Sequence, residues 1–139
     1  MEPTKILVDD DHPQNVELLE AYLMPEGYEV TTAFDGIEAL ERIEESEPDI
    51  VLLDVMMPRM DGYEVCQKLK SDEATRFIPI VMVTALKDLD DKIKSIEAGA
   101  DDFLTKPIVK IELLTRIRSL IRVKHLHDDL DRSYRELQE

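Results

Sequence analysis

The sequence is short of cysteine and of glycine, and each shortage excludes a class of protein. Cys66 is the single cysteine among 139 residues, so the chain forms no internal disulfide and has no cysteine pair to hold a metal. The four glycines, at positions 27, 36, 62 and 99, are too scattered to form the GxGxxG or P-loop motifs of nucleotide-binding proteins. We therefore interpret Cys66 as a half-buried structural thiol and expect no nucleotide-binding loop.

Basic residues and long apolar runs are also scarce. The chain has 17 Lys and Arg against 32 Asp and Glu, and the formal net charge of −15 opposes attraction to phosphate backbones, so we expect no direct binding of nucleic acid. Its longest apolar runs, such as residues 50–53 and 80–83, fall far short of the ~18 residues that cross a bilayer, and no basic, apolar leader opens the sequence. We expect no membrane insertion, no secretion and a cytoplasmic location.

The remaining composition is that of one compact domain, with 43% hydrophobic and 35% charged residues. Aliphatic or β-branched runs at residues 5–8, 28–32, 50–54, 78–84 and 102–105 predict strands, and segments of helical period lie between them. Residues 50–53 and 80–83 are apolar without alternation, which is typical of strands buried on both faces. The pattern predicts a doubly wound α/β domain with a parallel sheet and helices on both faces.

One long helix is predicted after Pro107, because no glycine or proline follows from residue 108 to the end. Its first half should pack on the sheet. From Val123 onward the apolar residues thin to a spacing of seven, with Leu130 and Leu137, which suits either a solvated helix end or a short coiled-coil stalk toward a partner or output domain. We divide the chain into a domain over residues 1–122 and a helical extension over residues 123–139.

Polar side chains stand at the ends of predicted strands, where an open α/β fold binds its ligands. They are the aspartates at residues 9–11, then Asp54, Thr84, and Lys106 with Pro107. Crowded carboxylates favour a hard divalent cation such as Mg²⁺ or Mn²⁺, and a lysine and a hydroxyl beside them suit the oxygens of a phosphoryl group. Asp54 is then a candidate nucleophile for forming an acyl phosphate.

In combination these motifs resemble the receiver domain of two-component response regulators, over nearly the whole chain to residue 122. The stretch DVMMPRMDG at residues 54–62 matches the family pattern Asp-x-x-Met-Pro-x-x-Asp-Gly, and Thr84-Ala85 and Lys106-Pro107 match two further motifs. The resemblance implies a flavodoxin-like fold with strand order 2-1-3-4-5. It also implies a phosphoacceptor switch that receives its phosphoryl group from a sensor histidine kinase, a phosphotransfer protein or a small phosphodonor.

The resemblance also implies a role for each matching position. Asp54 would be the phosphoacceptor, and the metal ligands would be Asp10, Asp11, Asp54 and the backbone carbonyl of Met56. The groups that bind the phosphoryl oxygens would be Thr84, Ala85 and Lys106. Thr84 and Phe103 would form the switch, and the Lys106-Pro107 bond would be cis. Met56 and Leu86 occupy positions that control the approach of water to the acyl phosphate, and both are bulky and apolar, which predicts slow self-dephosphorylation.

Three consecutive aspartates leave the register of the metal-binding pair open. We place the pair at Asp10 and Asp11, because Asn15 then follows it at the spacing found in relatives; Asp9 with Asp10 is the alternative. In the first register Asp9 replaces an aliphatic strand residue, so its carboxylate must find a partner or raise its pKa. We interpret His12 as a loop residue, and His125 and His127, which point to different helix faces, as solvated polar residues.

Residues 110–124 hold five basic residues against one acid. This is either a helix face that is solvated or paired within the chain, or a surface for acidic residues of the preceding helix (Asp88, Asp90, Asp91 and Glu97) in a symmetric dimer. Many relatives form such a dimer through the fourth helix, the fifth strand and the fifth helix. The cognate kinase and the output stay open.

Two other functions fit the sequence less well than the switch. An aspartate-nucleophile phosphohydrolase would need a general acid where Met56 stands and a cap insertion that the chain lacks, so we expect no enzyme acting on external substrates. A degenerate receiver that only binds partners is disfavoured by the intact Asp54, Thr84 and Lys106.

Overall fold

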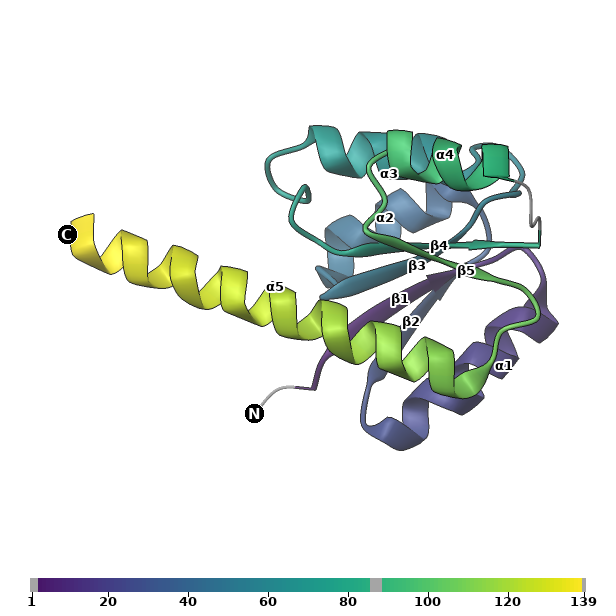
Figure 1. The fold of residues 1–139 in the computed structure, drawn as a ribbon, viewed down its shortest axis with the longest axis horizontal. Coiled ribbons are helices and arrows are strands. Elements are labelled where there is room, and N and C mark those ends of the chain that lie inside the picture. Colours follow the sequence, from purple (N-terminus) through teal and green to yellow (C-terminus); the bar gives the residue numbers. More distant parts are fainter. Residues whose placement is uncertain (1–2, 86–88, 139) are drawn as a thin grey trace.

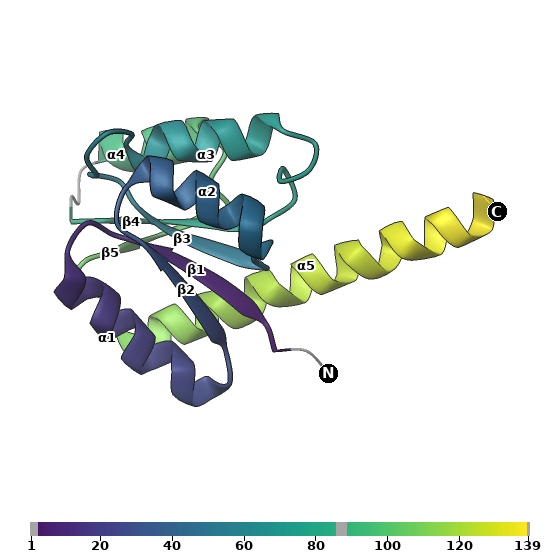
Figure 2. The same cartoon turned by 180° about the vertical axis from the view of Figure 1, so that it is seen from behind.

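The computed structural model describes residues 3–85 and 89–138, which form a layered α/β domain with a projecting C-terminal helix (Figures 1 and 2). The parallel sheet has five strands in the order β2-β1-β3-β4-β5. In chain order the strands are β1 (Lys5–Asp9), β2 (Glu29–Ala33), β3 (Ile50–Asp54), β4 (Ile80–Thr84) and β5 (Asp102–Thr105). The predicted flavodoxin-like sheet and its strand order are confirmed.

Helices cover both faces of this sheet (Figures 1 and 2). On one face lie α1 (Pro13–Leu23) and α5 (Lys110–Gln138). A short 3-10 turn, η1 (Met24–Glu26), follows α1. On the other lie α2 (Gly36–Ser46), α3 (Gly62–Ser71) and α4 (Leu89–Glu97). Because side chains alternate along a strand, Leu7 packs into the core on the α2–α4 side, whereas Ile6 and Val8 pack into the core on the α1 and α5 side. No helix in residues 3–85 and 89–138 is both long and apolar enough to cross a bilayer.

The strand ends differ from the predicted ones by one or two residues. β4 begins at Ile80 rather than at residue 78, because Pro79 has no N–H to donate and Ile78 instead closes a turn onto the carbonyl of Thr75. β2 is shifted by one residue, to Glu29–Ala33. β1 extends one residue further, so that Asp9 pairs with Ala33 on one side and Leu53 on the other. Asp9 is therefore a central strand residue.

Helix α5 continues without a break for 29 residues, as predicted. Its first half is held by buried apolar side chains, namely Leu113, Leu114, Ile117 and Ile121. Farther along, the side chains at the predicted spacing of seven are exposed: Val123 by 59%, Leu130 by 71% and Leu137 by 86%. This part of α5 extends past the sheet into solvent (Figure 1).

Candidate functional site

The site lies at the carboxyl edge of the sheet, where β1, β3, β4 and β5 end side by side. Asp54 is the last residue of β3 and Thr84 is the last residue of β4. The backbone N–H of Val55 donates to the carbonyl of Val83 at 3.1 Å, and that of Lys106 donates to the carbonyl of Thr84 at 2.7 Å. These two bonds continue the parallel pairing of the strands by one residue beyond their ends, which holds the polar side chains at this edge of the sheet in place.

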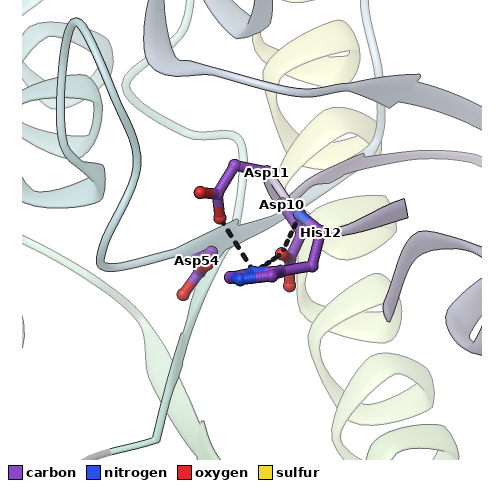
Figure 3. Close-up of side chains that lie close together, drawn as sticks. All are labelled: Asp10, Asp11, His12 and Asp54. Atoms are coloured by element: carbon purple, nitrogen blue, oxygen red, sulfur yellow. Dashed lines mark hydrogen bonds and ion pairs between the residues drawn. The ribbon is translucent and has the colours of Figure 1, made fainter. Parts of the chain in front are cut away.

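A cluster of acidic side chains and one imidazole forms at this edge (Figure 3). One donor atom from each of Asp10, Asp11, His12 and Asp54 lies within 4.8 Å of the others. Asp10 and Asp54 are almost fully buried, with 2% and 4% of their surface exposed. The loop after β1 is tied to the cluster, because the backbone N–H of His12 donates to Asp10 Oδ1 at 2.9 Å.

Lys106 brings a positive charge to the cluster. Its Nζ lies 3.1 Å from Asp10 Oδ2 and 3.5 Å from Asp54 Oδ1. The pKa of Asp54 is raised to about 6, because burial and then the neighbouring Asp10 raise it by more than Lys106 and the backbone N–H of Met56 lower it. One lysine therefore offsets only part of the negative charge of three carboxylates.

The donor atoms fit a hard divalent cation. Carboxylate oxygens are the ligands that Mg²⁺ and Mn²⁺ prefer. Asp11 Oδ1 is buried and has no hydrogen-bond partner among the described residues, which leaves its lone pairs available to an ion. A cation here would also relieve the repulsion among the carboxylates that burial makes costly.

Asp9 is separate from this cluster although it precedes it directly. It is 1% exposed, and neither of its carboxylate oxygens has a hydrogen-bond partner within the described part of the chain. Burial raises its pKa to about 8, with further contributions from Asp35, Asp54, Glu38 and Asp10. The structure thus groups Asp10 and Asp11 with Asp54, which favours the first of the two registers.

The other predicted positions lie around the same edge. Thr84 is buried and Ala85 is exposed beside it. The Lys106–Pro107 peptide bond is cis, as expected. Phe103 of β5 is partly buried against the core on the α2–α4 side, and Lys92 Nζ lies 5.4 Å from the centre of its ring.

The side chain of Met56 is 67% exposed, and Leu86 lies outside the described residues.

Sequence reasoning missed one member of the cluster. His12 lies in the loop between β1 and α1, as predicted, but its Nδ1 also lies 3.0 Å from Asp11 Oδ1 and 3.3 Å from Asp10 Oδ1. The available signal was its position, directly after the aspartates and directly before Pro13, which opens α1. A residue held between a strand end and a proline at a helix start has little freedom to leave the edge of the sheet.

Comparison with known sequences gives a consistent picture. Residues 6–118 match the response regulator receiver domain family. The chain is 56% identical over 126 residues to response regulator PleD of Caulobacter vibrioides, and 44% identical over 118 residues to the DNA-binding dual master transcriptional regulator RpaA of Synechocystis. These matches cover 91% and 85% of this chain but only 28% and 49% of the two relatives. The chain thus spans one part of each longer protein.

Solved structures resemble the fold over almost their full length. One is the receiver domain of a sensor histidine kinase from Pseudomonas aeruginosa PAO1, which holds a magnesium ion in its active site cleft; it matches with a TM-score of 0.80 and 33% identity, over 86% of this chain and 98% of that chain. Another is a CheY-like receiver domain protein from Methanospirillum hungatei JF-1, with a TM-score of 0.84 and 28% identity, over 91% of this chain and 99% of that one.

Proposed function

This chain belongs to the response regulator receiver domain family of two-component signalling, and from that premise we propose that it is a phosphorylation switch with Asp54 as the phosphoacceptor. The phosphodonor would be a sensor histidine kinase, a phosphotransfer protein or a small phosphorylated molecule. The observation that carries the proposal is the position of Lys106 Nζ, within 3.5 Å of both Asp10 and Asp54 at the carboxyl edge of the sheet.

The transfer requires a nucleophile, charge compensation and a fixed geometry. An Asp54 carboxylate oxygen forms the new bond to phosphorus while the bond from phosphorus to the donor breaks and the donor leaves with that electron pair. Lys106, already beside Asp54, then binds a phosphoryl oxygen through its ammonium group. The hydroxyl of Thr84 and the backbone N–H of Ala85 stand at the end of the adjacent strand and supply neutral donors to the other oxygens.

Mg²⁺, or Mn²⁺ in its place, would be held by Asp10, Asp11, Asp54 and the backbone carbonyl of Met56. When bound, such an ion neutralises the negative charge that accumulates on the transferring phosphoryl group. The magnesium-bound receiver domain from Pseudomonas aeruginosa supports this choice of cofactor.

The response to phosphorylation would pass through Thr84 and Phe103. Thr84 shifts toward the phosphoryl group, and Phe103 turns into the space that it leaves, which changes the surface of α4, β5 and α5. Phe103 is only partly buried and contacts Lys92 of α4, so its movement alters the packing of α4 directly. Met56 and Leu86 would limit the approach of water and slow the loss of the phosphoryl group.

The output would be carried by two surfaces. One is the α4–β5–α5 face, on which Ile96 and Ile111 are 64% and 74% exposed and could pack in a symmetric dimer. Of its predicted acidic residues, Asp88 and the side chain of Asp91 lie outside the described part of the chain. The other is the extension over residues 123–139, a linker or coiled-coil stalk to an output domain. We place the protein in the cytoplasm, without direct nucleic-acid or membrane binding and without activity on external substrates.

Part of the basic stretch is already paired within the chain. Arg116 donates to Asp102 at 3.0 Å, Arg118 to Glu26 at 3.2 Å and Lys124 to Asp128 at 2.6 Å. These bonds favour intramolecular pairing over a continuous basic interface at residues 110–124.

Intact-mass spectrometry after incubation with acetyl phosphate and Mg²⁺ tests the proposal. We expect one phosphoryl adduct, lost in Asp54→Asn and in EDTA. Asp49→Asn, just before the opposite end of β3, is the control that keeps it. Light scattering on the same samples reports whether the adduct causes dimerisation. If no adduct forms and beryllofluoride with Mg²⁺ does not bind, the chain is a degenerate receiver and the proposal is wrong.

A further inference from the structure

His12 is the one histidine that lies beside the carboxylates. The chain has three histidines, and the other two, His125 and His127, are on the distal part of α5. The ring of His12 is 61% exposed, but its Nδ1 points into the cluster toward Asp10 and Asp11 (Figure 3). An imidazole nitrogen in this position is a potential metal ligand.

The donor atoms lie nearly as close together as ligands around one ion. Donors that share an ion at about 2.1 Å lie about 3 Å apart when adjacent and about 4.2 Å apart when opposite. His12 Nδ1 lies 3.0 Å from Asp11 Oδ1 and 3.3 Å from Asp10 Oδ1, and the whole set with Asp54 falls within 4.8 Å. Small side-chain rotations would bring all of these donors to one centre.

The state of Asp11 is a second, independent indication. Its Oδ1 is buried and lacks a hydrogen-bond partner among the described residues, although His12 Nδ1 is 3.0 Å away. The imidazole is thus close to Asp11 Oδ1 without the alignment of a hydrogen bond. His12 Nδ1 makes its hydrogen bond to Asp10 Oδ1 instead, at 3.3 Å, so an ion bound here would replace that bond and would also take up the unpartnered Asp11 Oδ1.

We propose that His12 Nδ1 is a metal ligand, which converts the carboxylate site into a mixed carboxylate and imidazole site with increased preference for first-row transition ions over Mg²⁺. The proposal rests on the proposed function, because it concerns the ion at the same site. Mg²⁺ favours oxygen ligands, whereas imidazole suits later first-row ions such as Co²⁺, Ni²⁺ and Zn²⁺. The ring would bind as the neutral tautomer with its proton on Nε2.

The backbone favours this role. The N–H of His12 is fixed to Asp10 Oδ1 at 2.9 Å, and Pro13 starts α1 with a restricted φ angle. The Cα of His12 is therefore held, and only the side-chain dihedral angles need to change when an ion enters. Such preorganisation lowers the cost of recruiting a ligand from a loop.

Pulsed electron paramagnetic resonance on the Mn²⁺-loaded protein tests the inference directly. We expect a nitrogen coupling of a bound imidazole in the wild type, lost in His12→Ala and kept in His125→Ala, the matched control on α5. In calorimetry, His12→Ala should weaken Co²⁺ binding by about tenfold or more while Mg²⁺ binding changes by less than about threefold. His12→Gln should resemble His12→Ala in both measurements.

The outcomes separate this inference from the proposed function. If the wild type shows no imidazole coupling, or if His12→Ala keeps it, the His12 inference is wrong, whereas the phosphorylation switch stands as long as Mg²⁺ supports the Asp54 adduct. If Asp11→Asn and Asp54→Asn bind Mg²⁺ and Mn²⁺ as the wild type does, the ion lies elsewhere and both proposals fail.

Discussion

Two buried carboxylates at the carboxyl edge of the sheet, Asp54 and Asp9, have opposite surroundings. Asp54 is 3.5 Å from Lys106 and stands among groups that can share a cation. Asp9 has no hydrogen-bond partner in the described structure, and burial raises its pKa to about 8, compared with about 6 for Asp54. Burial alone therefore does not make a carboxylate functional. A positively charged partner decides whether the buried group stays ionised, and so able to act as a nucleophile or ligand, at neutral pH.

The pleat of β1 explains the difference. Leu7 faces the core on the α2–α4 side, so Asp9, two residues later, faces the same layer. Among the charged groups, Asp35, which caps α2 and is also negative, contributes most to the raised pKa of Asp9. Asp10 lies just past the strand end and reaches Lys106 instead. One residue along the chain thus separates a paired carboxylate from an unpaired one.

Removing Lys106, the positively charged partner of Asp54, should have the largest effect. In Lys106→Ala, we expect the rate of adduct formation from acetyl phosphate to fall by about 10² to 10³, because a charge that stabilises the transferring phosphoryl group is lost. The pKa of Asp54 should also rise, since Lys106 now lowers it. Intact-mass time courses measure the rate. Lys110→Ala, at the start of α5, is the control and should react like the wild type; equal rates in Lys106→Ala would contradict the assigned role.

Removing the unpaired carboxylate should stabilise the protein. Asp9→Val restores an apolar, β-branched residue in a central strand, and we expect the free energy of unfolding in urea to rise by about 1 to 3 kcal/mol at pH 7.5. Asp9→Asn removes the charge but keeps a polar group without a partner, so its gain should be smaller. A loss of stability in Asp9→Val would mean that Asp9 has a stabilising partner, and the contrast with Asp54 would disappear.

The pH dependence of stability should separate the two carboxylates. The folded-state pKa of Asp9 is raised from 3.8 to about 8, so between these values the folded protein keeps a proton that the unfolded chain has released. The contribution of Asp9 to the free energy of unfolding is therefore largest below pH 4. It falls between about pH 4 and pH 8, by up to about 1.4 kcal/mol per pH unit, and is lost above the folded-state pKa. Asp54 adds the same sign only up to about pH 6. Urea unfolding between pH 5 and 8.5 should show the fall from 6 to 8 in the wild type and not in Asp9→Val.

The sequence predicted those parts of the molecule that depend on local patterns. Apolar runs predicted β3 and β4. The positions of Asp54, Thr84 and Lys106 at strand ends predicted that they share a site, because the carboxyl ends of parallel strands meet at one edge. The sequence alone was less decisive about two features, one set by the exact end of a strand and one set by the direction of a side chain. The register of the three aspartates depends on how far β1 extends, and the inclusion of His12 depends on a rotamer. Neither leaves a periodic signal in the sequence.

The smallest effect should come from Arg59, an exposed cation that pairs with Asp35. Arg59 makes a two-pronged ion pair with Asp35, in which Nε donates to Oδ2 at 3.1 Å and Nη2 donates to Oδ1 at 2.9 Å, and its backbone is left-handed, with φ of 66°. Arg59→Gly loses an exposed pair that contributes about 0.2 to 1 kcal/mol but relieves backbone strain of about 1 kcal/mol, so the free energy of unfolding at pH 7.5 should change by less than about 1 kcal/mol.

The informative part of this variant is its effect on Asp9. The pKa of Asp35 is lowered by the backbone N–H of Glu38 and also by Arg59, whose charge partly offsets that of Asp35. Without Arg59, the Asp35 charge should raise the pKa of Asp9 further and move the pH-dependent loss of stability to higher pH. The same substitution in Asp9→Val should leave the pH profile unchanged. If Arg59→Gly shifts the pH profile equally in the wild type and in Asp9→Val, the shift comes from the titration of Asp35 itself. Arg59 then does not affect the pKa of Asp9 in the way that Lys106 affects the pKa of Asp54.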